Sequence, residues 1–441
     1  MIGIVVSRAD FASEHIGEHL LDLEAWERQE DASRSEGDGG GTFYRTKGFE
    51  LREFDEFHLY LEDVAEAFDD PSMIVFASRH SGETGPLLTA HVPGNFGPAE
   101  FGGRDRDVPA APPNALSHLV EAFERNVPED YDVGMECTHH GPSRVGVPAM
   151  YVEVGSAEPQ WEDPEGARAV AKSILALQGV DARTGRAFVG FGGSHYVPRF
   201  ERIVRETPWS VGHIAADWAI DDMGDPEDDP NRAVIRRAFG RTGTTYAVID
   251  GEYPAIERVI EELGYRVVSE TWLREVGDWP LGLVERLEDA LSTIDDGLRL
   301  GTVVDEEFDV VDLPSELLAE AQGIEPDGTR EVLVENAVAF ETTHGGTRAV
   351  DRAAVAGGRA RNAIVEGFAE ILRATYDHVD VGSAAVVARE TAFDPALARE
   401  QGVPEGPKFG ALAAGESVDV DGETIAPEDV HVERTNRFPT S

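Results

Sequence analysis

Lysine, cysteine and long apolar runs are all scarce in this sequence. Of the 38 Lys and Arg residues in a chain of 441, only three are lysines. The single cysteine, Cys137, excludes an intramolecular disulfide framework and a Cys-rich zinc finger. No apolar run approaches the roughly 20 residues that cross a bilayer, and the N-terminal MIGIVVSRAD lacks the basic start of a signal peptide. We therefore expect a soluble, cytoplasmic protein without a membrane partner.

Acidic residues, by contrast, are abundant along the whole chain. There are 85 Asp and Glu residues, which give a net charge of -47 and a pI near 4.5. An acidic partner-binding tail would be local, so a charge this widespread favours adaptation to molar salt. A net acidic protein is usually a poor nucleic-acid binder, but counterion release drives little binding in molar salt. The charge therefore does not exclude an RNA substrate.

Length and periodicity predict an α/β protein of two or three domains. At about 150 residues per domain the chain is long enough for more than one core. Buried apolar strands alternate with helical spacings such as those of residues 11–23, 57–68, 112–127, 164–177 and 254–263, which favours a parallel or mixed sheet with helices on both faces. The expected strands are residues 2–6, 73–77, 149–154, 187–191, 245–249 and 266–269.

Two acidic stretches interrupt this pattern. Residues 24–41 end in SEGDGGG and are typical of an exposed insertion. Residues 276–330 are expected to be a solvated connecting region, because the part from 285 onward carries 14 acidic and three basic residues. Residues 331–441 are expected to be an α+β extension with a strand at 331–341, a helix at 353–375 and a hairpin turning at Asp421-Gly422.

Five polar, Gly-rich segments carry the chemistry-bearing side chains. They are residues 78–85, 88–97, 136–142, 191–196 and 212–213, and two of them follow expected strands, where open α/β sheets bind ligands. Seven of the 13 histidines lie between residues 80 and 213, and six of those seven lie in these segments. Imidazole and carboxylate suit both proton transfer and zinc ligation. The candidate metal ligands are His80, His91, Glu136, His139, His140 and His195, with Glu83 and Cys137 also near.

Several alternatives stay open at this point. A histidine beside a glycine turn is often only structural, and Cys137 is better explained as a small buried apolar residue than as a nucleophile. His139 and His140 are adjacent, and on an extended segment they would point to opposite sides. Gly192 and Gly193 either allow a turn or offer bare N–H donors to an oxyanion. The Gly-rich motifs of dinucleotide sites, P-loops and serine hydrolases are missing at the strand-to-helix turns.

Taken together, the motifs resemble a known family. SRHSGETG, LLTAHVPGNFG, ECTHHGP, VGFGGSHYVPRF and GHIAADW occur in the order and spacing of the archaeal and plant type of D-aminoacyl-tRNA deacylase, also called D-tyrosyl-tRNA deacylase. The resemblance covers residues 1–275, which would be the catalytic domain. The longer chain and its acidity resemble the form found in salt-loving archaea.

The resemblance implies an activity, a cofactor and a partner. The family hydrolyses the ester between a D-amino acid and the 3′ end of tRNA, which proofreads mischarged tRNA. Its members are described as containing zinc, with two ions per subunit, and their fold is similar to peptidyl-tRNA hydrolase and nucleoside phosphorylases. The tRNA acceptor end would be the partner of a monomeric enzyme.

The roles of individual residues are inferred from their chemistry and position in the sequence, and not from the family. A zinc- or His-activated water would attack the ester carbonyl, with His80, Glu83, His139 and His195 as catalytic candidates. Phe96, Phe191 or Tyr196 would stack on the terminal adenine, and a pocket wall would exclude the L side chain. The substrate-binding candidates are Arg79, Asn95, Phe96, Gly192, Gly193 and Tyr196. The alternatives are a metal-dependent hydrolase of another small ester, phosphoester or nucleoside, and a non-catalytic tRNA-binding protein.

Overall fold

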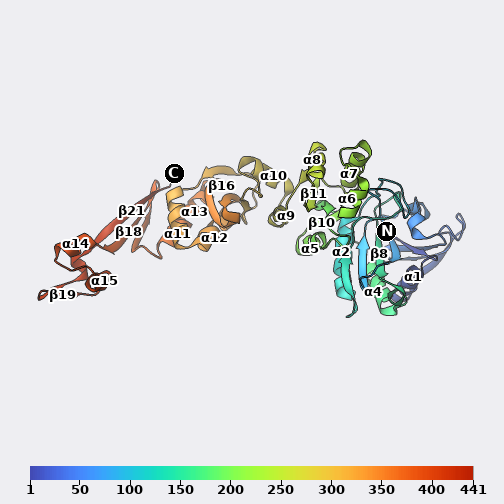
Figure 1. The fold of residues 1–441 in the computed structure, drawn as a ribbon, viewed down its shortest axis with the longest axis horizontal. Helices are drawn as coiled ribbons and strands as arrows, with labels where there is room; N and C mark the ends of the chain where they lie inside the picture. Colours follow the sequence, from blue (N-terminus) through green and yellow to red (C-terminus); the bar gives the residue numbers. More distant parts are fainter. Residues whose placement is uncertain (441) are drawn as a thin grey trace. The chain divides into compact units, whose positions relative to one another are not determined.

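The computed structural model describes residues 1–440, which form two compact units (Figure 1). The first unit is Met1–Gly277, and the second begins at Asp278. No helix among the described residues is long and apolar enough to cross a membrane.

The main sheet of the first unit is mixed and has eight strands, in the order β2-β3-β4-β1-β5-β8-β6-β7. Strands β4, β1, β5 and β8 are parallel, whereas β6 runs antiparallel to β8 and parallel to β7. The central strands are apolar and buried on both faces, as expected for parallel strands covered on both sides. The bounds are β1 Ile2–Ser7, β2 Glu27–Asp31, β3 Gly41–Thr46, β4 Phe49–Phe54, β5 Met73–Arg79, β6 Leu87–His91, β7 Asp132–Met135 and β8 Ala149–Gly155.

A layer of three helices covers one face of this sheet (Figure 1). They are α1 (Phe11–Leu23), α2 (Pro113–Asn126) and α4 (Pro164–Leu175), and α3 (Glu158–Trp161) lies beside α1 and α4. In α2, Pro113 occupies the first turn, and Leu116, Leu119 and Phe123 are buried on one side. On the other face, the short 3-10 helices η1 (His58–Tyr60) and η2 (Val64–Ala67) bring apolar side chains against Phe76 and Tyr151.

A second sheet in the same unit has four parallel strands, in the order β10-β9-β11-β12. The segment after β7 joins the two sheets, because the N–H of Cys137 donates to the carbonyl of His195 and that of Thr138 to the carbonyl of Ile214, both at 2.9 Å. The strands are β9 Ala187–Gly192, β10 Ser210–Ala215, β11 Tyr246–Asp250 and β12 Arg266–Val267, and the helices are α5 Pro198–Glu206, α6 Asp217–Met223, α7 Asp229–Thr242, α8 Pro254–Glu262 and α9 Glu270–Val276.

The second unit is α+β. A four-stranded antiparallel sheet β13-β15-β16-β14 and a three-stranded sheet β17-β18-β21 share one core with α11, α12 and α13. The elements are α10 Leu281–Ala290, β13 Leu298–Leu300, β14 Asp309–Asp312, α11 Ser315–Ile324, α12 Pro326–Asn336, β15 Ala339–Thr343, η3 His344–Gly346, β16 Arg348–Val355, α13 Gly357–Leu372, β17 His378–Val381, β18 Ala385–Phe393, α14 Pro395–Glu400, α15 Pro407–Ala413, β19 Val418–Val420, β20 Glu423–Ile425, η4 Pro427–Asp429 and β21 His431–Pro439.

The expected α/β class with a C-terminal α+β extension is confirmed, but several local expectations are wrong. Residues 27–31 of the expected insertion form the edge strand β2, and residues 57–68 form two short 3-10 helices instead of one α-helix. Residues 331–336 lie in α12, which begins at Pro326. The region expected to be a solvated connector contributes Leu317, Leu318 and Ala321 to the core of the second unit, since its apolar residues recur on one side of α11 while its acidic residues face water.

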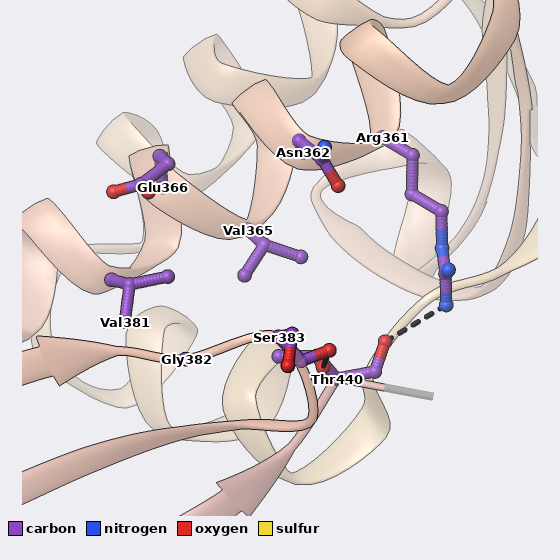
Figure 2. Close-up of a pocket in the computed structure, with 8 residues that line it drawn as sticks. All are labelled: Arg361, Asn362, Val365, Glu366, Val381, Gly382, Ser383 and Thr440. Carbon is purple, nitrogen blue, oxygen red and sulfur yellow. Dashed lines mark hydrogen bonds between the residues drawn. The ribbon is translucent and has the colours of Figure 1, made fainter.

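The second unit contains a cavity of about 320 Å³, shown in Figure 2. Arg361 and Glu366 of α13 line it together with the turn at Gly382-Ser383, and the guanidinium of Arg361 donates to the carbonyl of Thr440 at 2.8 Å. Among its described lining residues there is no histidine or cysteine. This cavity therefore lacks the groups that the expected hydrolysis needs.

Candidate active site

The centre of the site is the carboxylate of Glu136, which directly follows β7 and is buried. Its Oε2 accepts a hydrogen bond from Nε2 of His195 at 2.8 Å, and its Oε1 lies 3.3 Å from Nδ1 of His80. His139 approaches the same carboxylate at 3.7 Å. Burial raises the pKa of Glu136, but the hydrogen bond from His195 and the nearby imidazole of His80 outweigh burial and hold that pKa well below its usual value. Glu136 is therefore an ionised acceptor among histidines.

His80 lies between two carboxylates at the end of β5. Its Nδ1 is 3.3 Å from Glu136 and 3.7 Å from Glu153, a residue of β8, while its Nε2 is 3.2 Å from the hydroxyl of Tyr196. Burial lowers the pKa of His80, but the nearby carboxylates of Glu136 and Glu153 raise it more, so that the net pKa is raised. His80 is thus the group in the cluster best suited to carry a proton.

Three further histidines present bare ring nitrogens to one another. The Nδ1–H groups of His91, His139 and His140 donate to the carbonyls of Val92, Cys137 and Gly141, at 3.2, 2.8 and 3.4 Å. Each bond leaves Nε2 as a lone-pair donor, the arrangement that orients histidine metal ligands. Burial lowers the pKa of His139 and of His140 well below the usual value, and the neighbouring histidines lower it further. Both rings are therefore neutral, as metal ligands must be.

The donor set fits a metal ion. Ligand atoms of His91, His139 and His140 lie within 4.8 Å of one another, and the sets Glu136–His139–His195 and His80–Glu136–Glu153 meet the same limit. Two buried atoms of the cluster, Nε2 of His91 and Oε1 of Glu136, have no hydrogen-bond partner. Because unpaired buried polar atoms are costly, they indicate a group that completes the site. Imidazole and carboxylate in this number are the ligands that zinc takes.

One expectation about this geometry is wrong. His139 and His140 do not diverge, because His140 has a φ of 44° and the turn brings both rings to His91, with ring centroids at 4.0 and 4.6 Å. The segments of His80 and His195 follow β5 and β9, as expected, but the cluster is not confined to the carboxyl ends of the strands. Since β6 runs antiparallel to β8, His91 lies beside Tyr151, while His80 lies at the carboxyl end of β8, where its N–H donates to the carbonyl of Val154. The cluster therefore extends along the sheet face.

Arg79 and Asn95, both expected to bind substrate, lie at the edge of the cluster. The guanidinium of Arg79 is half-exposed between the rings of Phe57 and Trp161, at 5.4 and 4.9 Å. The amide of Asn95 donates to the carbonyl of Gly102 at 3.0 Å. Asn95 also lines a cavity beside His139 and His140, and the substrate-binding roles of both residues stay predictions.

Other predicted residues are placed differently. Phe96 and Phe191 are 1% and 0% exposed in the core of the second sheet, so they cannot stack on a base. Gly192 has a φ of 92°, and a Cβ there would collide with the carbonyl of Asp250. The conformation of the turn therefore accounts for a glycine at this position. Glu83 is exposed, and no metal-competent group among the described residues includes it. Cys137 is buried, and burial raises its pKa to about 12, as suits an inert thiol.

Three further residues of the candidate site were not predicted from the sequence. Glu153 occupies an apolar strand, and a carboxylate within AMYVEV was the signal that pointed to it. Trp218 and Phe101 border a cavity of about 220 Å³ beside His139 and His140. Trp218 ends the motif GHIAADW, but neither that motif nor the context of Phe101 indicates that the two rings meet, because only the packing of α6 against the first sheet's loops brings them together.

Comparisons with known proteins agree with the motifs. Residues 67–268 match the sequence profile of the D-aminoacyl-tRNA deacylase family. The chain is 55% identical to the D-aminoacyl-tRNA deacylase of Halorubrum lacusprofundi, an alignment that covers 100% of this chain and 97% of the relative. The enzyme of the same name from Natronomonas pharaonis is 54% identical, with 99% and 100% covered.

A solved structure is also similar. The crystal structure of the conserved protein of unknown function AF0625 superimposes with a TM-score of 0.56 at 27% identity, covering 62% of this chain and 96% of that one. From its match to the family profile and its full-length identity to halophilic relatives, the chain belongs to the D-aminoacyl-tRNA deacylase family.

Proposed function

We propose that the cluster around Glu136 is where this chain hydrolyses the ester of D-aminoacyl-tRNA. The products are the free D-amino acid and a tRNA whose terminal ribose regains its hydroxyl. The observation that carries the proposal is a buried, ionised carboxylate held among five histidines, with two atoms left unpaired. We place the reaction in the cytoplasm, where a single chain meets charged tRNA.

His91, His139 and His140 would hold a zinc ion through their bare Nε2 atoms. When bound, the ion supplies Lewis-acid catalysis and lowers the pKa of water. The set His80–Glu136–Glu153 offers a second position, and an ion bound there would take these groups out of proton transfer. Elemental analysis of the pure protein gives the number of ions per chain and distinguishes one filled position from two.

The residues of this chain move the proton. Oε1 of Glu136, which has no hydrogen-bond partner, takes the proton of the attacking water as its oxygen bonds to the ester carbonyl. His195 orients the carboxylate through Oε2. When the bond to the ribose oxygen breaks, that oxygen receives a proton from the pair of His80 and Tyr196, whose Nε2 and hydroxyl are 3.2 Å apart. D over L selection is then a matter of which side chain the walls admit.

The activity test compares D- and L-tyrosyl-tRNA in molar KCl. We expect hydrolysis of the D form only, and loss of activity with Glu136→Gln by about 10²- to 10⁴-fold, the usual contribution of a general base. The exposed Glu121 of α2 provides the control Glu121→Gln, which should retain full activity. Equal rates for the two enantiomers, or full activity of metal-free protein after chelation, would contradict the proposal.

We also propose that the second unit is accessory, since the candidate groups all lie in Met1–Gly277. A chain ending at Gly277 tests this in the same assay. Near-normal turnover supports an accessory role, whereas a folded, metal-loaded but inactive protein shows that the second unit takes part in hydrolysis or in holding tRNA.

A further inference from the structure

A small cavity lies directly beside the histidine cluster. Its volume is about 220 Å³, below the roughly 300–1,000 Å³ of cavities that hold drug-sized ligands, which suits a single ring system. His139 and His140 form one wall of it. Whatever occupies it is therefore adjacent to the groups that would act on the ester. The remaining lining residues are Asn95, Pro98, Glu100, Phe101, Trp218 and Asp222.

Two exposed aromatic side chains border this cavity. Phe101 is 63% exposed and Trp218 is 42% exposed, which is unusual for rings of this size. The indole of Trp218 also lies nearly parallel to the imidazole of His195, with centroids 6.3 Å apart and an interplanar angle of 29°. Exposed rings beside an RNA-processing centre are the surfaces on which unstacked bases bind.

The polar lining excludes phosphate. Among the described lining residues there is no Arg or Lys, whereas Glu100 and Asp222 present carboxylates. A phosphate would be repelled, while an exocyclic amine of a base would find acceptors. In molar salt, moreover, phosphate contacts contribute little, so stacking must supply more of the affinity.

The surroundings of His80 have a different chemistry from this cavity. There the hydroxyls of Tyr196, Thr84 and Ser156 lie near His80, and the Thr84 hydroxyl is hydrogen-bonded to that of Ser156. Hydroxyl groups suit the amino and carbonyl groups of an aminoacyl moiety. The cavity is therefore aromatic and acidic, whereas the surroundings of His80 are rich in hydroxyl groups.

We infer that the cavity binds the base of the terminal adenosine, stacked on Trp218 and Phe101, while the aminoacyl group extends toward Tyr196. The inference rests on the proposed function. It replaces Phe96 and Phe191, which are buried, with Trp218 and Phe101 as the base-binding residues.

The test compares kcat/KM for two ester substrates between the unchanged full-length protein and several of its variants, in molar KCl. One substrate is 3′-D-tyrosyl-adenosine, and the other is the same ester on an abasic ribose. We expect removal of the base to lower kcat/KM of the unchanged protein by about 10- to 100-fold, as the loss of one base–aromatic stack does. Phe101→Ala and Trp218→Leu should lower kcat/KM for the adenosine ester similarly and leave the abasic ester within about twofold, whereas Trp218→Phe should retain most of the activity.

The control is Phe11→Ala, which removes a ring on α1 whose exposure (55%) lies between those of Trp218 and Phe101 and which does not line the cavity. It should behave as the unchanged protein with both esters. Equal hydrolysis of the two esters by the unchanged protein, or an equal loss on both in Phe101→Ala and Trp218→Leu, would overturn the inference. If Phe101→Ala or Trp218→Leu changed the preference between D-tyrosyl and D-alanyl adenosine, the inference would also be overturned. Such a change would place the amino-acid side chain, and not the base, in the cavity. If the unchanged protein hydrolyses no D-aminoacyl ester at all, the proposed function itself fails.

Discussion

A buried histidine outside the cluster illustrates how strongly the surroundings of a single residue change its pKa. His213 of β10 donates from Nε2 to the carbonyl of Pro109 at 2.9 Å, and its Nδ1 is 3.2 Å from the hydroxyl of Thr138. Burial lowers its pKa to about 4, from an ordinary value of 6.5. The folded protein therefore keeps His213 neutral at pH values where the unfolded chain takes up a proton.

The sign of the pH effect follows from this difference. Because the unfolded state binds more protons below its own pKa, the free energy of unfolding falls as pH decreases from about 6.5 to about 4, by about 3 kcal/mol in all. We expect His213→Gln to remove that share of the pH dependence, as measured by denaturant unfolding in molar KCl at about pH 7 and about pH 5. The exposed His118 supplies the control His118→Gln, which should keep the original pH dependence. Identical pH profiles for both variants would refute the assignment.

At the scale of elements, the site depends on helices that hold its strands in place. Helix α4 packs against β8, the strand that carries Glu153. Its N-cap is Asp163, whose carboxylate accepts from the N–H of Glu165 at 3.0 Å and from the hydroxyl of Tyr131 at 2.7 Å. Burial and this bond to Asp163 raise the pKa of Tyr131. One side chain thus caps the helix and ties it to the loop before β7.

Removing that side chain should weaken the element. We expect Asp163→Ala to lower the free energy of unfolding by about 1–2 kcal/mol, from the lost cap and the unpaired Tyr131 hydroxyl. Asp163→Asn keeps an acceptor oxygen and should lose much less. Thermal unfolding of both variants in molar KCl measures the difference, and kcat/KM should stay unchanged. Equal melting temperatures for the two variants would rule out the capping role.

At the scale of the whole molecule, charge is the dominant feature. A net charge of -47 makes neighbouring carboxylates repel one another unless salt screens them. The Debye length falls from about 10 Å at 0.1 M salt to about 3 Å at 1 M. We therefore expect the melting temperature to rise steadily as KCl increases from about 0.1 M to well above 1 M. Sucrose, which does not screen charge, serves as the control, and a flat or falling curve in KCl would contradict salt adaptation.

The sequence by itself determined the net charge of the protein and predicted most residues of the candidate site. Buried strands such as residues 73–77 and 149–154 were predictable because a short, continuous apolar run is typical of a strand that is covered on both faces. His80, His91, Glu136, His139 and His195 were identifiable because polar groups gathered in Gly-rich segments are unusual. The hairpin at Asp421-Gly422 was likewise predictable from turn chemistry and is confirmed by β19 and β20.

Only the tertiary structure decided which groups meet and which side chains reach a ligand. The antiparallel insertion of β6 between β8 and β7 brings His91 to His139 and His140, and periodicity does not report strand direction. Phe96 and Phe101 lie five positions apart in one loop, yet Phe96 is buried and Phe101 is exposed. Burial depends on what packs against a residue from distant parts of the chain, and local sequence does not contain that information.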